Sequence, residues 1–265
     1  MKIGVLAKQV PDTATKIKIR EDQSGIVTDD IKWILNPYDE FAVEEALKLK
    51  AKIGQGEVVI ISLGPKRVQE AMRTALAMGA DRGIHIEDQA LEGSDTLGIA
   101  KAIHAAIKEE DFSILFAGKI AVDDDNLQMV QVLGELLGWS HAQPIEHFEI
   151  SSDFKKATVH RMVGGGTKEV IEVTLPAVFG CDKGLNQPRY ASLPGIMKAK
   201  SKPIKTLALS DLGLNKSEVG KEGAQLVLEK IEPPPERKAG RIIEGDSQEA
   251  SKKLIDLLRN EAKAI

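Results

Sequence analysis

The sequence predicts an α/β protein built on a doubly wound, mostly parallel sheet. Short apolar runs at residues 2–7, 58–62 and 113–117 are typical of strands that are buried on both faces. Between these runs, apolar residues recur at helical spacing, so strand and helix alternate through the first half of the chain. This alternation is the pattern of βαβ units with right-handed crossovers.

Local signals place the individual elements. Asn36 stands before Pro37 and two acidic residues, which is the pattern of a helix start with Asn36 as its cap. We expect further helices at about 67–79, 94–109 and 125–137, and a further strand at 83–86.

The pattern changes after Pro144. Residues 147–179 are typical of three strands, two of them joined by a turn of three glycines at 164–166, and they predict an antiparallel extension of the sheet. We therefore expect an α/β domain over residues 1–206 and a C-terminal arm over residues 207–265.

The predicted arm contains a stiff linker and a terminal helix. Three prolines at 233–235 stiffen the linker, and Asp246 and Glu249 are spaced as a capping box. The apolar stripe of the helix is Leu254, Ile255, Leu257 and Leu258. So short a helix must bury that stripe, either on its own domain or on another subunit.

Composition narrows the function classes. The chain has 265 residues, a net charge of -4 and 4% aromatic residues, which disfavours nucleic-acid binding. The single cysteine, Cys181, excludes an internal disulfide and a thiolate zinc cage, and the five histidines share no metal-ligand spacing. We recognise no membrane span, secretory signal or transit peptide, and we expect the cytoplasm, or the mitochondrial matrix in a eukaryote.

Residues 184–205, called the basic segment below, are the most unusual stretch. From Lys183 to Lys205 there are six Lys or Arg residues and no Asp or Glu. One interpretation is a docking device, in which an apolar anchor is ringed by cations that steer an acidic partner. The other is a loop whose apolar residues pack into their own core. The residues that the first interpretation uses are Tyr190, Leu193, Pro194, Ile196, Met197, Lys198 and Lys200.

A ligand site is expected at the carboxyl ends of the strands, near the switch in strand order. The loop from Gly118 to Gln128 leads into a helix whose first amides are free to hold a phosphate, although it is not a P-loop. Residues 123–125 are three aspartates, which would repel a phosphate if all faced it. At least one would then serve the helix dipole or a ribose hydroxyl, or all three simply decorate the helix start.

The amino-acid sequence of the basic segment also resembles that of a known protein family. The stretch Leu185-Asn186-x-Pro188-Arg189-Tyr190-Ala191-Ser192-Leu193-Pro194-x-Ile196-Met197-Lys198-Ala199-Lys200 resembles the signature of the electron transfer flavoprotein beta subunits. The resemblance extends to residues 36–37, 73–83, 123–125 and 175–178, and it covers the whole chain, most weakly after residue 206.

The resemblance implies a Rossmann-like or flavodoxin-like fold and an electron carrier without catalytic residues of its own. AMP would be bound structurally, and the redox FAD would be held mainly by an alpha subunit. Electrons would pass from acyl-CoA-type dehydrogenases of fatty acid oxidation to a quinone oxidoreductase. Leu193 would anchor the dehydrogenase, with Lys198, Lys200 and Lys202 steering it. The implied nucleotide contacts, called the strand-end cluster below, are Leu6, Ala7, Asn36, Leu63, Gly118, Asp123, Asn126, Gln128 and Met129.

Two other functions remain open. One is a bifurcating beta subunit that binds FAD in place of AMP, although that branch typically has Asp-Gly-Asp-Thr where this chain has Asp-Asp-Asp. The other is a stand-alone adenine-nucleotide binder or hydrolase. This chain also departs from the family in two places: Met129 replaces a small polar residue, so its backbone amide would have to serve, and Met162 replaces an acidic residue after Arg161.

Overall fold

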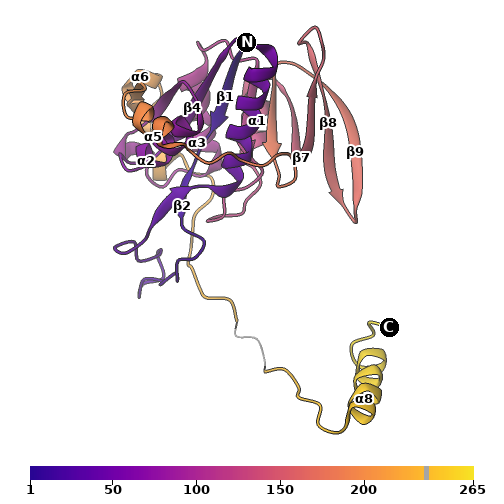
Figure 1. Ribbon diagram of the computed structural model, residues 1–265. Helices are drawn as coiled ribbons and strands as arrows, with labels where there is room; N and C mark the ends of the chain where they lie inside the picture. Colours follow the sequence, from indigo (N-terminus) through magenta and orange to yellow (C-terminus); the bar gives the residue numbers. More distant parts are fainter. Residues whose placement is uncertain (236–238) are drawn as a thin grey trace.

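The computed structural model describes residues 1–235 and 239–265 (Figure 1). The described residues form a nine-stranded sheet in the order β11-β5-β4-β1-β6-β10-β7-β8-β9. Its strands are β1 (Lys2–Leu6), β4 (Glu57–Leu63), β5 (Arg82–Ile86), β6 (Ile114–Gly118), β7 (Ser140–Ile150), β8 (Lys156–Gly164), β9 (Thr167–Thr174), β10 (Ala177–Cys181) and β11 (Ile204–Leu207).

The strands from β11 to β7 pair in parallel, and only β8 and β9 are antiparallel to their neighbours. From β1 the chain moves outward through β4 to β5, and then returns to the other side of β1 with β6. The strand order therefore switches between β1 and β6, and the predicted doubly wound sheet with an antiparallel extension is confirmed.

Two hydrophobic layers sandwich the sheet. On one face, α1 (Pro37–Ile53) and α2 (Val68–Met78) pack over a core that includes Ile60 and Phe116. On the other face, α3 (Thr96–Ile107) and α4 (Met129–Leu137) pack over Ile61 and Leu115. Neighbouring residues of β4 and β6 thus point to opposite faces, and both are buried.

Four expectations are corrected by the structure. Residues 140–181 form four strands instead of three, because the apolar run of β10 inserts in parallel between β6 and β7. β7 already begins at Ser140 and continues through Pro144, where the pairing register with β10 shifts and a missing amide is tolerated.

α4 begins at Met129 instead of residue 125, because Asp125 and Leu127 have positive φ angles of 51° and 55°. The basic segment contains a short helix, α5 (Leu193–Ala199).

Several smaller elements had no clear signal in the sequence. Strands β2 (Gln9–Pro11) and β3 (Trp33–Leu35) form a separate antiparallel pair. Residues 208–223, which follow β11, stay on the body, where Leu209, Leu212 and Val219 are buried in the layer of α3. The boundary predicted at residue 206 falls within β11. The remaining short helices are η1 (Gln89–Leu91), α6 (Leu209–Leu212), η2 (Lys216–Glu218) and α7 (Gly220–Gly223).

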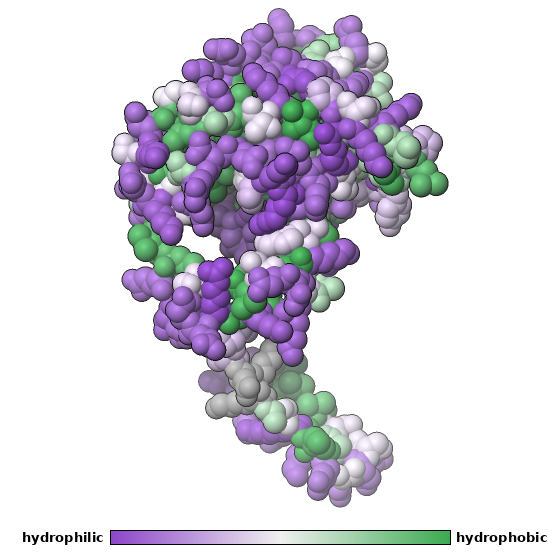
Figure 2. Space-filling model, turned by 90° about the vertical axis from the view of Figure 1, so that its left-hand side faces the viewer, coloured by the Kyte–Doolittle hydropathy of each residue, from purple (hydrophilic) through white to green (hydrophobic). Residues whose placement is uncertain are grey.

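The C-terminal helix α8 (Ser247–Asn260) stands apart from the body (Figure 1), and none of its residues is buried. Its N-cap is Asp246, whose carboxylate accepts hydrogen bonds from the amides of Gln248 and Glu249, so the Asp246 half of the predicted capping box is present. Leu254 and Ile255 are each 47% exposed, and apolar residues lie at the surface of this part of the chain in Figure 2. Within the described ranges, no helix is long and apolar enough to cross a membrane.

We expect the amide protons of α8 to exchange with solvent much faster than those of β1, β4 and β6 in the chain purified without a partner. The reason is that an isolated helix of 14 residues is marginal in water when its apolar stripe is not buried. Hydrogen exchange followed by mass spectrometry measures this directly. Protection of α8 equal to that of α1 would contradict the arrangement described here.

Candidate functional site

The strand-end cluster lies where β1, β4 and β6 end. The three strands are parallel neighbours, so Leu6, Leu63 and Gly118, their last residues, meet at one edge of the sheet. Ala7 continues the edge by donating its amide to the carbonyl of Ile61 at 2.9 Å. This edge adjoins the switch in strand order, which is where ligands bind in doubly wound sheets.

The buried carboxylate of Asp39, in the first turn of α1, holds this edge together. Its Oδ2 accepts the backbone amide of Lys8 at 2.7 Å, and its Oδ1 accepts the amide of Gly118 at 3.0 Å. Oδ1 also accepts a hydrogen bond from Nδ2 of Asn36 at 2.9 Å. One side chain therefore connects the ends of β1 and β6 with the start of α1.

Asn36 stands at the N-cap position of α1, but its side chain does not cap the helix, contrary to the sequence expectation. Its Nδ2 instead donates to the carbonyl of Ile120 at 2.8 Å, and its Oδ1 accepts the amide of Val122 at 3.3 Å. Asn36 is only 1% exposed, and the polar atoms of a buried amide side chain need hydrogen-bond partners. This explains why the side chain bonds to the loop instead of capping α1. Asn36 thus fixes the beginning of the loop at residues 119–128.

Gly118 is the residue that permits this close packing. A Cβ atom at this position would lie 2.5 Å from Oδ1 of Asp39 and 2.6 Å from Cβ of Tyr38. Any side chain would therefore push α1 away from the end of β6.

The aspartates of the loop are compensated by a cation. Nζ of Lys8 lies 2.8 Å from Asp123 and 2.9 Å from Asp124. Burial acts to lower the pKa of Lys8, but the two carboxylates outweigh it and raise the pKa above its ordinary value. Two of the three aspartates are therefore engaged, which reduces the repulsion that they would exert on a phosphate.

The end of the same loop is fixed by side chains from other elements. Nδ2 of Asn126 lies 3.2 Å from Oγ1 of Thr96, and Nε2 of Gln143 donates to the carbonyl of Leu127 at 2.8 Å. The side chain of Gln128 does not cap α4, so no side chain from the N-cap position occupies the amides at the start of that helix. These amides are the groups that bind anions at helix starts.

All nine residues of the strand-end cluster therefore belong to one edge of the sheet and to the loop that borders it. Three residues that shape this edge were not among the contacts predicted from the sequence. Asp39 looks like an ordinary first-turn acid, Lys8 like a strand-end lysine, and Gln143 like a residue of a connecting segment. Only the tertiary contacts distinguish them from other residues of these types.

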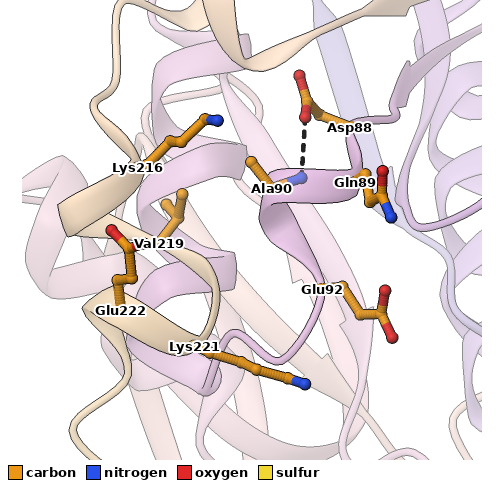
Figure 3. Close-up of a pocket in the computed structure, with 8 residues that line it drawn as sticks. All are labelled: Asp88, Gln89, Ala90, Glu92, Lys216, Val219, Lys221 and Glu222. Carbon is orange, nitrogen blue, oxygen red and sulfur yellow. Dashed lines mark hydrogen bonds between the residues drawn. The ribbon is translucent and has the colours of Figure 1, made fainter.

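A cavity of about 460 Å³ lies elsewhere, between η1 and the segment of η2 and α7 (Figure 3). None of the residues of the strand-end cluster lines it. Asp88, at its rim, is already occupied, because its carboxylate accepts the amides of Ala90 and Leu209. The other lining side chains are of mixed charge, so the cavity favours no particular class of ligand.

The residues of the basic segment that were expected to dock a partner lie at the surface. Tyr190 is 99% exposed, Leu193 79% and Met197 66%. The interpretation in which they pack into their own core is therefore wrong. Leu193 and Pro194 begin α5, where Oγ of Ser192 accepts the amide of Gly195 and caps the helix.

The side chain of Lys202, which was expected to steer a partner, is held against the body. Its Nζ donates to the carbonyls of Leu76 and Ala80 at the end of α2, at 2.9 and 2.5 Å. Burial lowers its pKa. Lys198 and Lys200 are exposed, as the expected steering role requires.

The other reactive side chains of the described chain serve the fold. Cys181 is fully buried in β10, and burial raises the pKa of its thiol well above the ordinary value, as expected for a structural cysteine. Arg161 pairs with Glu169 across the β8–β9 hairpin, next to Met162. Residues 1–235 and 239–265 hold no group of three or more His, Cys, Asp or Glu that could bind a metal ion.

We expect the contribution of Asp39 to the free energy of unfolding to fall as the pH rises from about 4 to 7, so the wild type should lose more stability over this range than Asp39→Asn. Burial raises the pKa of Asp39 to about 7 in the folded chain, against 3.8 as its ordinary value, although the donated hydrogen bonds oppose the shift. Between these values the folded chain binds the extra proton, so each pH unit costs at most about 1.4 kcal/mol of stability. Denaturant unfolding of the isolated chain and of Asp39→Asn measures this. Equal pH slopes for the two proteins would show that Asp39 is not the group responsible.

Comparison with known proteins identifies the family of the chain. The model of the electron transfer flavoprotein domain matches residues 24–212. The chain is 43% identical to the mitochondrial electron transfer flavoprotein subunit beta of Arabidopsis thaliana and 40% identical to the subunit beta of Bacillus subtilis, each over the full length of both chains. It is 39% identical to the human subunit beta, over 92% of this chain and 93% of the relative. The chain therefore belongs to the electron transfer flavoprotein family, among its beta subunits.

Proposed function

We propose that this chain binds AMP as a structural ligand and presents the docking surface for a donor dehydrogenase in a heterodimeric electron transfer flavoprotein. The observation that carries the proposal is the exposure of Tyr190, Leu193 and Met197 on a segment whose two ends are tied to the body. Large apolar side chains that are held out into water in this way are typical of partner contacts.

The strand-end cluster suits AMP. Gly118 leaves no room for a side chain at the edge, Lys8 offsets Asp123 and Asp124, and the amides that start α4 are positioned for an anion. Leu6, Ala7 and Leu63 would hold the adenosine part, and the backbone amide of Met129 would contribute to the phosphate site. AMP supplies no redox chemistry, so its role is to stabilise the folded edge.

The redox chemistry belongs to FAD, which the alpha subunit holds mainly in its own domain. This chain contributes a rigid base and the docking surface, which brings the donor close while the alpha subunit moves. The proposed donors are acyl-CoA-type dehydrogenases, and the proposed acceptor is a quinone oxidoreductase. The apolar stripe of α8 packs on the alpha subunit, because the described part of this chain leaves the stripe exposed.

The cellular compartment that we propose for the protein depends on the organism. Relatives include plant subunits that are named as mitochondrial and a subunit from a bacterium. We assign the chain to the cytoplasm in a bacterium, or to the mitochondrial matrix in a eukaryote.

We expect the purified heterodimer to release one AMP and one FAD when it is denatured by heat. Replacement of both Asp123 and Gln128 by Ala should lower the AMP content and the melting temperature together, since a ligand at a hundredfold excess over its dissociation constant adds about 2.7 kcal/mol. Chromatography of the released ligands and thermal unfolding measure both. Two FAD per heterodimer would favour the bifurcating alternative. Nucleotide hydrolysis in proportion to protein concentration would favour the stand-alone hydrolase.

We expect Leu193→Ala to raise the apparent KM for the donor dehydrogenase at every salt concentration. Truncation of an anchor that inserts into a pocket costs about 2 kcal/mol, or roughly thirtyfold in affinity. The control is the double change Lys198→Ala and Lys200→Ala, whose effect should fade as salt shortens the screening length below about 10 Å. Reduction of the heterodimer by the dehydrogenase is the assay. If Leu193→Ala also strips AMP or unfolds the protein, the change acts through the stability of the fold and the docking assignment is wrong.

A further inference from the structure

Two neighbouring carboxylates of α1, Glu44 and Glu45, are each only 5% exposed. Buried carboxylates are rare unless other groups pair with them. Both lie about one and a half turns after Asp39, and both reach the beginning of the basic segment instead of the strand-end cluster. Neither was expected from the sequence to have a role in this protein.

Glu44 accepts three hydrogen bonds from Arg189. Its carboxylate accepts Nε of Arg189 at 2.7 Å and Nη2 at 2.8 Å, and it also accepts the backbone amide of the same residue at 3.1 Å. Burial acts to raise the pKa of Glu44, but the bonds from Arg189 outweigh it and hold the pKa below its ordinary value. A bidentate pair combined with a backbone bond fixes direction as well as distance.

The residues just before Arg189 are fixed to the same helix. Nδ2 of Asn186 donates to the carbonyl of Phe41 and to Oε2 of Glu45, both at 2.9 Å. The chain therefore leaves α1 from a defined place, and the next residue, Tyr190, is 99% exposed.

The far end of the basic segment is fixed to α2. Nη1 of Arg73 donates to the carbonyls of Ala199 and Lys202, both at 2.6 Å. Lys202 itself is bonded to the end of α2, as described above. Between these two ties α5 packs against α2, with Gly195 close to the carbonyl of Ala77, while the side chains of Tyr190, Leu193 and Met197 point into solvent.

We propose that Glu44 is a positioning residue for docking: by holding both the side chain and the backbone of Arg189, it sets the direction in which Tyr190 and Leu193 leave the surface. The partner is the protein that receives Leu193, so this inference rests on the proposed function. A segment that is ordered before the encounter loses less conformational entropy on binding. Without Glu44 the same side chains would still be exposed and α5 would still pack on α2, but the turn that leads from Arg189 into α5 would lose its tie to α1.

The chain can tolerate loss of this contact. The side chain of Arg189 is 47% exposed and lines a cavity of about 420 Å³ beside Lys48 and Phe148. When Glu44 is neutral, the guanidinium can therefore reach water instead of being left buried without a partner. Glu44→Gln, which keeps the shape of the side chain, should fold.

The test is a double-mutant cycle in the complete heterodimer, with Glu44→Gln, Leu193→Ala and both changes together. Glu40→Gln is the matched control, because it removes one negative charge from the same helix and no described hydrogen bond joins Glu40 to the basic segment. The measurements are the apparent KM and kcat for reduction by the dehydrogenase, the AMP content, and hydrogen exchange of residues 189–200.

We expect Glu44→Gln to raise the apparent KM roughly five- to tenfold at every salt concentration, with kcat and AMP content unchanged and exchange of residues 189–200 faster. The effect of Leu193→Ala should be smaller in the Glu44→Gln background, because the two residues act in one contact. Glu40→Gln should change none of these quantities.

Three results would overturn the inference. If Leu193→Ala raises the KM but Glu44→Gln does not, or if their effects simply add, Glu44 does not position the anchor and the docking function itself still stands. If Glu44→Gln lowers the AMP content as much as the KM changes, Glu44 supports the whole fold. If Leu193→Ala leaves the KM unchanged at every salt concentration, the docking function fails, and the positioning role fails with it.

Discussion

The buried carboxylate of Asp39 is the interaction on which the rest of this structure depends. It accepts two backbone amides from the ends of β1 and β6 and one side-chain amide from Asn36. Parallel strands offer unpaired amides where they end, and these groups must find partners when they are buried. A single acid at the start of α1 meets this need, and Gly118 provides the space in which it can do so. The strand-end cluster owes its shape to this contact.

Helix α1 holds the basic segment as well as the strand ends. Its first turn holds the edge of the sheet, and about one and a half turns later Glu44 and Glu45 hold Arg189 and Asn186. Asp39 and these two glutamates are separated by about 8 Å along the helix, since each residue adds about 1.5 Å. One rigid element thus places both the proposed nucleotide site and the proposed docking surface, without any catalytic group in between.

The sequence predicted the elements that obey a simple period and missed those that depend on distant partners. The buried strands β1, β4 and β6 were found because parallel strands show as continuous apolar runs. The start of α4 was predicted too early. The backbone at Asp125 and Leu127 has positive φ angles that depend on the contacts of the loop, and neither residue type predicts them. Lys202 looked like one more steering cation, since its bonds to α2 are invisible in a linear pattern. The strand-end residues lie close together, and their contact with a nucleotide stays a prediction, whereas Asp39 and Lys8, which shape this edge, were not singled out.

The central claim is that the exposed side chains of the basic segment remain available in the assembled protein. A crystal or electron cryomicroscopy structure of the heterodimer with its nucleotide tests this most directly. The account predicts AMP at the ends of β1, β4 and β6, with α8 against the alpha subunit and Tyr190, Leu193 and Met197 still facing solvent. A structure in which the alpha subunit covers these three side chains would contradict it, because they would then belong to the subunit interface and could not receive a dehydrogenase.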